Sequence, residues 1–386
     1  MQNTKNKKRI IAIIAGSRGE YGYIRPIIRE IEKDPELDYG LIATNMHVLD
    51  SFGRSVDEIK KDKIKIFSEV HNTFDGYTNL TMVKSLSVFM LQLPEILKQM
   101  EADVVLISGD RGEQLVAAIV GAYMYIPVAH IQAGEVSGNI DGTTRHAITK
   151  FSHIHFPANK DAAERVIKMG EQKERVFTVG APQLDELIAG KVTPTKDICK
   201  KFQLKNNEPK ILFVFHPITE EIDNLEKHMD KVMLALSSFK YQTVIILNNS
   251  DAGSNIIRRK ITEHRKPNMK IYKNIPREDY AGLLNTVDVL VGNSSSGILE
   301  APTFKLPAVN IGNRQKGRMR GINVIDVDYN KQQIEKAIKS AMSASFKKKM
   351  NKCINPYGDG DSAKRIVAVL KSAKINSKLL IKQLTY

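Results

Sequence analysis

The chain has 386 residues, of which 42% are hydrophobic and 26% charged, so it is long enough for two domains and unlike a disordered protein. Its formal net charge is +15, but the basic residues are scattered without interleaved aromatic residues, which disfavours nucleic-acid binding. Cys199 and Cys353 lie far apart without metal-ligand spacing, which excludes a disulfide framework or a zinc site. The first apolar run is too short for a signal peptide or a membrane span, so we expect a cytoplasmic protein without a membrane partner.

Short runs rich in β-branched residues alternate with longer helical patterns along the chain. Such runs are typical of buried parallel strands. In the first half they predict strands at 9–15, 38–44, 102–107, 126–131 and 176–179. In the second half they predict strands at 210–215, 242–247, 269–272, 287–291, 307–311 and 323–326.

A polar stretch rich in lysine and threonine after residue 190 predicts a connector between two domains. We therefore expect two Rossmann-like α/β domains, 1–190 and 205–365, followed by a closing segment, 366–386. In such folds ligands bind at the carboxyl ends of the strands. The chemistry is therefore expected in the loops that follow the strands, in a cleft between the domains.

The first strand ends in a glycine-rich turn at residues 15–23, and a helix is predicted to begin near Ile24, with Pro26 in its first turn. Backbone N–H groups at a helix N-terminus can bind an anion, and Arg18 can add a bidentate contact to a phosphate. The turn lacks the spacing of a dinucleotide-binding fingerprint or a Walker loop. A tight turn with a surface arginine is therefore an equally good interpretation.

A second loop of this kind spans residues 291–300, after an apolar strand of the second half. Ser294 and Ser295 offer N–H and hydroxyl donors for phosphate oxygens, and Glu300 could accept both hydroxyls of a ribose. The alternative interpretation is a run of serines that caps a helix.

Further polar residues follow strands of the first half, among them Asp110, Arg111, Gln132, Glu135 and Asp141. Asp110 and Asp141 are candidates for proton transfer, because a partly desolvated carboxylate near another one has a raised pKa. Asp110 could instead cap a helix.

In the second half, His216 ends a strand, where it could donate to a phosphate or act as an acid. A lone histidine at a strand end is more often structural. Two later strands end in loops that contain Asn249 and Arg314, and both loops are rich in hydrogen-bonding groups.

Taken in this order, the motifs resemble the UDP-N-acetylglucosamine 2-epimerase family, in particular its hydrolysing branch, which serves sialic acid-type biosynthesis. The resemblance runs from about residue 9 to about residue 370, and four segments carry it: 134–150, 293–297, 312–315 and 355–360. It implies a GT-B architecture in which the last helix packs back on the first domain. It also implies a homodimer or homotetramer and no cofactor or metal.

The resemblance implies a reaction in which the proton on carbon 2 is removed as the nucleoside diphosphate departs. The resulting 2-acetamidoglucal takes up water with inversion, which gives N-acetylmannosamine and UDP. By resemblance, Asp110 and Asp141 transfer protons. Arg18, Arg111 and His216 neutralise the leaving diphosphate. The remaining roles are nucleotide binding for Asn249, Ser294, Ser295, Glu300 and Arg314, and a sugar-facing position for His47.

Gln132 departs from the family pattern, because many members have a glutamate there. An amide cannot exchange a proton near neutral pH. Either Glu135 takes over that proton transfer, or Gln132 marks a subgroup that acts on UDP- or GDP-linked 2,4-diacetamido-2,4,6-trideoxyglucose, on the route to legionaminic acid. UDP-N-acetylglucosamine remains the expected substrate. A GT-B glycosyltransferase and a sugar-nucleotide sensor that lost activity through Gln132 are the alternatives of other classes.

Overall fold

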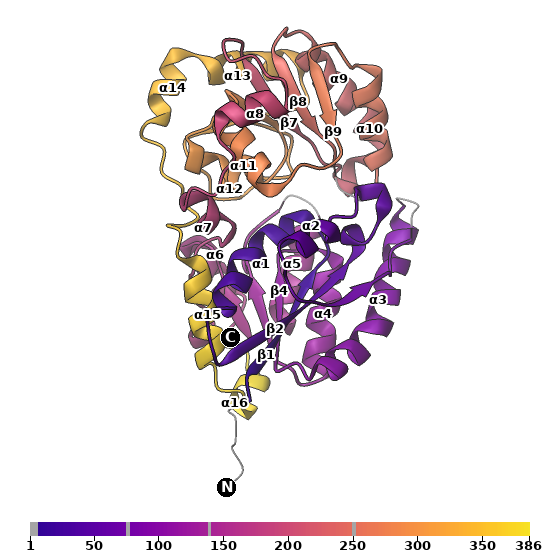
Figure 1. The fold of residues 1–386 in the computed structure, drawn as a ribbon, viewed down its shortest axis with the longest axis vertical. Coiled ribbons are helices and arrows are strands. Elements are labelled where there is room, and N and C mark those ends of the chain that lie inside the picture. Colours follow the sequence, from indigo (N-terminus) through magenta and orange to yellow (C-terminus); the bar gives the residue numbers. More distant parts are fainter. Residues whose placement is uncertain (1–6, 75–77, 138–139, 249–251) are drawn as a thin grey trace.

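The computed structural model describes residues 7–74, 78–137, 140–248 and 252–386. Its strands form two six-stranded parallel sheets, one in each half of the chain (Figure 1). The strand orders are β3-β2-β1-β4-β5-β6 and β12-β11-β10-β7-β8-β9. In both sheets the order reverses once, between β1 and β4 and between β7 and β10, which is where such sheets bind ligands. The prediction of two Rossmann-like halves is confirmed.

The first sheet consists of β1 Arg9–Ala15, β2 Leu37–Thr44, β3 Ile66–Val70, β4 Val104–Ser108, β5 Val128–Ile131 and β6 Ile154–Phe156. The second consists of β7 Lys210–Val214, β8 Gln242–Ile246, β9 Met269–Tyr272, β10 Val289–Gly292, β11 Ala308–Ile311 and β12 Val324–Val327.

The strand predictions are correct to within a few residues, with three errors in the first half. The segment 176–179 is not a strand, since only Val176 makes an isolated bridge, to His155. The strands β3 and β6 escaped prediction for different reasons. β3 is a half-exposed edge strand and β6 has only three residues, so neither presents a long apolar run.

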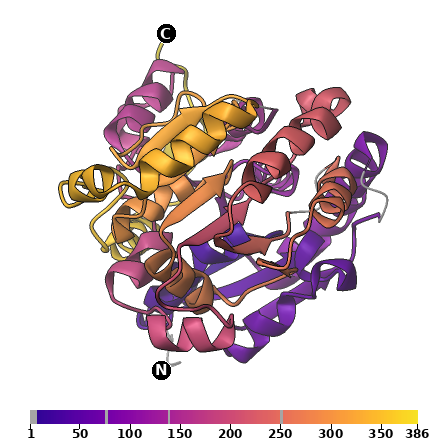
Figure 2. The ribbon, with the colours of Figure 1, turned by 90° about the horizontal axis from the view of Figure 1, so that it is seen from above.

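Helices cover both faces of each sheet (Figures 1 and 2). The first half contains α1 Arg18–Ile31, α2 Val56–Lys61, α3 Asn79–Met100, α4 Gly112–Tyr123, α5 Ile140–Phe151, α6 Lys160–Lys168 and α7 Gln183–Ile188. The second contains α8 Thr195–Lys201, α9 Leu225–Ser237, α10 Ser254–Glu263, α11 Arg277–Thr286, α12 Ser296–Leu299, α13 Lys331–Met342 and α14 Ala344–Met350. Two C-terminal helices follow, α15 Ser362–Ser372 and α16 Ser377–Leu380.

The C-terminal segment returns to the first half of the chain. In Figure 1, α15 lies beside α1, next to the lower sheet. Its buried residues Ile366, Val367 and Leu370 belong to the same apolar core as β1 and α1. The chain therefore crosses from the first sheet to the second and back, and its C-terminal segment completes the core of the first half.

The helix α1 begins at Arg18, so the predicted start near Ile24 is wrong and Pro26 lies inside the helix. Ser17 caps the helix and Glu20 completes a reciprocal capping box with it. A serine followed three residues later by a glutamate is the sequence signal for this start. The glycine-rich composition of the turn obscured it.

Among the described residues, α3 is the one helix long and apolar enough to cross a bilayer. Phe89, Leu93 and Leu97 on one of its faces are fully buried against the first sheet and α4. The apolar character of this face therefore serves packing within the domain.

Candidate active site

A cavity of about 240 Å³ lies between the two sheets and is lined by both halves of the chain. Its walls come largely from the loops after β1, β4, β7 and β10, the strands at the two reversal points. The structure brings ten of the predicted site residues together there: Arg18, His47, Asp110, Arg111, Asp141, His216, Ser294, Ser295, Glu300 and Arg314. Gln132 and Glu135 are not among the lining residues, and Asn249 lies outside the residues that the structure describes.

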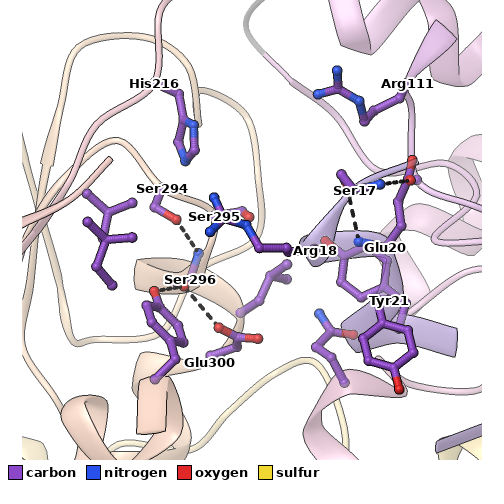
Figure 3. A pocket seen from close by; sticks show the side chains of 18 of the residues that line it. Ser17, Arg18, Glu20, Tyr21, Arg111, His216, Ser294, Ser295, Ser296 and Glu300 are labelled. Carbon is purple, nitrogen blue, oxygen red and sulfur yellow. Dashed lines mark hydrogen bonds between the residues drawn. The ribbon is translucent and has the colours of Figure 1, made fainter. Parts of the chain in front are cut away.

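Two backbone N–H groups of the loop after β1 are occupied by a side chain of the same turn. The N–H groups of Gly16 and Ser17 both donate to Glu20 Oε2, at 2.6 and 2.8 Å. The carboxyl group of Glu20 thus occupies the place expected for an anion (Figure 3). Burial raises the pKa of Glu20 to about 8, so this group is largely protonated at neutral pH. The N–H groups of Gly16 and Ser17 are therefore already occupied within the turn.

Arg18 reaches across the cleft from the first turn of α1. Its guanidinium donates to the Lys273 carbonyl at 3.0 Å and to Asn274 Oδ1 at 2.5 Å. In Figure 3 its side chain extends from the side of Ser17 towards Ser294 and Ser295. Arg18 therefore connects the two walls of the cavity, and its position fits a contact with an anion held between them.

The carboxylate of Asp110 follows β4 and is bound by a buried arginine. Arg145 Nη2 donates to it, and Ser137 Oγ donates weakly at 3.4 Å. Burial opposes ionisation of Asp110, but cationic neighbours outweigh this effect and hold its pKa below the ordinary value. In decreasing order of effect, these neighbours are Arg145, Arg318, Arg314 and Arg111. Asp110 is therefore ionised at neutral pH, contrary to the raised pKa expected, and it can accept a proton or a hydrogen bond.

Gln132 acts through its backbone in this structure. It is buried with a φ of 61°, and its carbonyl accepts a hydrogen bond from Arg145 Nη1 at 2.9 Å. The same guanidinium holds Asp110. Gln132 thus positions Arg145. Its side chain is not among those that line the cavity, and its buried Nε2 has no hydrogen-bond partner among the described residues.

Glu135 is committed to a structural contact between the two halves of the chain. Its carboxylate accepts hydrogen bonds from Asn159 Nδ2 at 2.8 Å and from the Tyr357 hydroxyl at 3.4 Å. The same hydroxyl also contacts the Met319 carbonyl. Glu135 is buried and is not among the residues that line the cavity, and its role in proton transfer stays a prediction.

His47 lines the cavity, but both of its ring nitrogens are occupied. Nε2 contacts the Ser17 carbonyl at 3.0 Å and Nδ1 contacts Ser55 Oγ at 2.8 Å. Because a carbonyl only accepts, Nε2 carries the proton and Nδ1 accepts from the serine. His47 therefore supports the loop after β1, and no ring nitrogen remains for the predicted contact with the sugar.

The burial of His47 predicts a loss of stability as the pH falls below 6.5. Burial, with a smaller effect of Arg18, lowers its pKa to about 4, from about 6.5 in an unfolded chain. Between these values the unfolded chain binds more protons, so this residue lowers the free energy of unfolding by about 1.4 kcal/mol per unit fall in pH. Thermal unfolding over this pH range measures the effect. A His47→Gln variant with an undiminished pH dependence would contradict it.

The loop after β10 presents hydroxyl groups and one carboxylate to the opposite wall (Figure 3). Ser294 and Ser295 line the cavity just before α12. Glu300 accepts a hydrogen bond from Ser296 Oγ at 2.9 Å and lies 3.4 Å from Arg277 Nη1. These contacts fix the Glu300 carboxylate at the surface of the cavity, an orientation compatible with a pair of hydroxyl groups.

His216 and Arg314 share a buried support, the side chain and backbone of Asn293. The Asn293 amide binds the backbone of His216 twice, at 2.7 and 2.8 Å. The Asn293 carbonyl accepts from Arg314 Nη1 at 3.3 Å and from Gln315 Nε2 at 2.9 Å. This arrangement directs the imidazole and the guanidinium into the same cavity.

Arg111 lines the cavity and lies near a buried carboxylate. Its Nε lies 3.6 Å from Glu113 Oε2, and Glu113 also accepts a hydrogen bond from Asn45. Glu113 is buried, so part of the positive charge of Arg111 is already compensated.

The lining residues that were not predicted as site residues include Tyr23, Arg145, Arg277 and Arg318. They lie within helices or late in a loop, away from the strand ends that guided the search. Arg145 and Arg318 are almost fully buried, which is unusual for arginine and marks a function for the charge. Their occurrence in otherwise helical or glycine-rich stretches was the only available signal.

A surface cluster of possible metal ligands lies apart from the cavity. It contains Asp230, Glu263 and His264. Lys260 Nζ is 3.1 Å from Asp230 and 3.0 Å from Glu263, so an ammonium group already forms ion pairs with both carboxylates.

The chain resembles known proteins along most of its length. The profile of the UDP-N-acetylglucosamine 2-epimerase family matches residues 29–371. The chain belongs to this family. It is also 36% identical to a UDP-N,N'-diacetylbacillosamine 2-epimerase (hydrolyzing) of Legionella pneumophila, over 97% of this chain and 98% of the relative. A UDP-N-acetylglucosamine 2-epimerase of Neisseria meningitidis is 32% identical over 87% of this chain and 88% of its own length. These findings confirm the predicted class, a hydrolysing nucleotide-sugar 2-epimerase.

Solved structures confirm the predicted GT-B architecture. A Neisseria meningitidis UDP-GlcNAc 2-epimerase crystallised with UDP-GlcNAc superposes with a TM-score of 0.79 at 19% identity, over 94% of this chain and 99% of that chain. A Methanocaldococcus jannaschii UDP-GlcNAc 2-epimerase gives a TM-score of 0.77 at 20% identity, over 94% and 100% of the two chains. At these identities the likeness concerns the fold.

Proposed function

We propose that this epimerase hydrolyses a nucleotide-linked 2,4-diacetamido-2,4,6-trideoxyglucose, with inversion at carbon 2 and release of the nucleoside diphosphate. The observation that carries the choice of sugar is the 36% identity, over nearly the full length of both chains, to a relative named for diacetylbacillosamine. A GDP/UDP-N,N'-diacetylbacillosamine 2-epimerase (hydrolyzing) of Campylobacter jejuni, 32% identical over 88% of this chain, supports the same choice.

The geometry of the cavity supports the steps of this reaction. Asp110 is ionised at neutral pH and lies on the wall of the first domain, where it can accept the proton of carbon 2. Asp141 lines the same wall and is the candidate for delivering a proton during hydration. Departure of a diphosphate requires compensation of negative charge, and Arg18, His216 and Arg314 lie on the surface of the cavity for this task.

The nucleotide is assigned to the side of the second domain. Ser294 and Ser295 offer donors to its phosphates, and Glu300 can accept the hydroxyls of its ribose. Asn249 keeps its predicted place in nucleotide binding as part of this proposal. We also propose a soluble, cytoplasmic homodimer or homotetramer, which light scattering tests.

The second candidate substrate is UDP-N-acetylglucosamine, the substrate expected from the sequence. The 32% identity to the meningococcal enzyme named for this sugar favours it. The chemistry at carbon 2 is the same for both sugars, so the cavity walls described above serve either one.

The test is to incubate the purified protein separately with UDP-N-acetylglucosamine and with UDP- and GDP-linked 2,4-diacetamido-2,4,6-trideoxyglucose in heavy water. Nucleoside diphosphate release gives the rate, and NMR identifies the free sugar. We expect faster turnover of a diacetamido substrate and deuterium at carbon 2 of the product. Faster turnover of UDP-N-acetylglucosamine would select the second candidate. Retention of the original hydrogen at carbon 2 would refute the elimination mechanism, and turnover only with an added acceptor would indicate a glycosyltransferase.

A further inference from the structure

Tyr23 lines the cavity and has no role in the steps described so far. It belongs to α1, and its Cε2 lies 3.9 Å from the point where a Cβ on Gly109 would stand. Gly109 directly precedes Asp110, so the phenol ring lies beside the loop that carries this carboxylate. Within the described residues, the Tyr23 hydroxyl has no hydrogen-bond partner. A half-buried hydroxyl that lines a cavity without a partner is suited to bind a ligand.

The charges around Tyr23 come from both halves of the chain. Burial raises the pKa of its phenol above the ordinary value, Arg318 lowers it, and Asp110 and Glu300 raise it further. The phenol is therefore protonated at neutral pH. Asp110 lies on the wall assigned to the sugar and Glu300 on the wall assigned to the nucleotide. Tyr23 consequently lies where the two parts of the substrate meet.

One bond of the substrate breaks at this junction, the bond between carbon 1 and the diphosphate oxygen. Negative charge grows on that oxygen as the bond breaks, and a fixed donor aimed at it lowers the barrier. Two arginines, Arg145 and Arg318, lower the pKa of Tyr23, and both are already engaged. Arg145 binds Asp110 and the Gln132 carbonyl, and Arg318 binds the Val136 carbonyl at 2.8 Å. The phenol hydroxyl is a donor at this position without such an engagement.

We propose that the Tyr23 hydroxyl donates a hydrogen bond to the diphosphate oxygen that leaves carbon 1. This inference rests on the proposed function. The electron pair of the broken C2–H bond forms the C1=C2 double bond, the pair of the C1–O bond leaves with the diphosphate, and the proton of carbon 2 passes to the base. Tyr23 keeps its own proton, because a phosphate with a pKa of about 6 is a much weaker base than a phenolate.

The test separates elimination from hydration in a Tyr23→Phe variant of the full chain. Nucleoside diphosphate release from the nucleotide sugar measures elimination, and addition of water to the matching 2-acetamidoglucal, supplied directly, measures hydration. We expect elimination to slow by about 100-fold through kcat, with little change in KM, because one transition-state donor is lost. Hydration breaks no bond to a diphosphate, so it should proceed at the wild-type rate, which also shows that the variant is folded.

Tyr39→Phe is the matched control. Tyr39 is buried in β2 of the same domain, and its hydroxyl contacts Glu32 and the Lys65 N–H away from the cavity. Both rates should stay at the wild-type value in this variant. An equal loss of elimination and hydration in Tyr23→Phe, or no loss of either, would overturn the inference alone. A wild-type protein that releases no nucleoside diphosphate would refute the proposed function and the inference with it.

A fluorinated tyrosine placed at position 23 gives a second test that preserves the shape of the side chain. Fluorination lowers the pKa of the phenol, and a phenolate cannot donate a hydrogen bond. The rate of elimination should therefore fall as the pH rises, and in the fluorinated protein this fall should begin at a lower pH than in the wild type. Superimposable pH profiles would count against the hydrogen bond even if Tyr23→Phe failed to fold.

Discussion

Replacement of Asp110 by asparagine is expected to slow turnover by about 1,000-fold while the nucleotide still binds. The amide has the size of the carboxylate but cannot accept the proton of carbon 2 at neutral pH. Asp110 lies on the wall opposite Ser294, Ser295 and Glu300, so the assigned nucleotide contacts stay intact. Initial rates of nucleoside diphosphate release measure the first effect, and calorimetric titration with the nucleoside diphosphate measures the second.

Asp57→Asn serves as the control for this prediction. Asp57 lies in α2 of the same domain with 55% of its side chain exposed, so its replacement removes the same charge outside the cavity. This variant should retain the wild-type rate. A near-normal rate in Asp110→Asn would remove Asp110 from proton transfer and leave Asp141 as the remaining carboxylate of that wall.

The positions of Asp110, His216 and Ser294 could be predicted because a topological rule applies to them. Each follows a strand at the point where a sheet reverses its order, so the strand pattern alone indicates a shared edge. By the same rule, the pattern of strands alone predicts two domains with a cleft between them. The position of a strand end, however, specifies where the backbone of a residue lies and does not specify which groups its side chain contacts.

His47 and Glu135 illustrate the part of the site that the sequence could not reveal. Each has a chemistry suited to catalysis, and each is bound to backbone or side-chain groups elsewhere in the fold. His47 supports the turn after β1, and Glu135 joins the two halves. Such partners depend on distances of a few ångströms between segments remote in sequence, as with Glu135 and Tyr357.

Arg145 combines support of the site with stability of the fold. Only 1% of its side chain is exposed, and it binds the Gln132 carbonyl and the Asp110 carboxylate with two different nitrogens. Gln132, the residue that departs from the family pattern, is therefore connected through Arg145 to the proposed base, Asp110. A substitution at position 132 that preserves the backbone should therefore affect Asp110 less than a change of Arg145.

Replacement of Arg145 by methionine is expected to lower the free energy of unfolding, by less than the about 3–5 kcal/mol typical of a fully buried pair, because it leaves the Asp110 carboxylate, 19% exposed, without its partner. The pKa of Asp110 should rise, since Arg145 is the strongest of the cations that lower it. A base with a higher pKa loses its proton at a higher pH, so the acidic limb of the rate profile should move to higher pH. Urea unfolding and kcat/KM as a function of pH measure these two effects.

Arg145→Lys is the control. It keeps the charge but lacks the planar fork that binds two acceptors, so it should retain more stability than the methionine variant. Equal stability of the methionine variant and the wild type would show that other cations suffice to hold the Asp110 carboxylate.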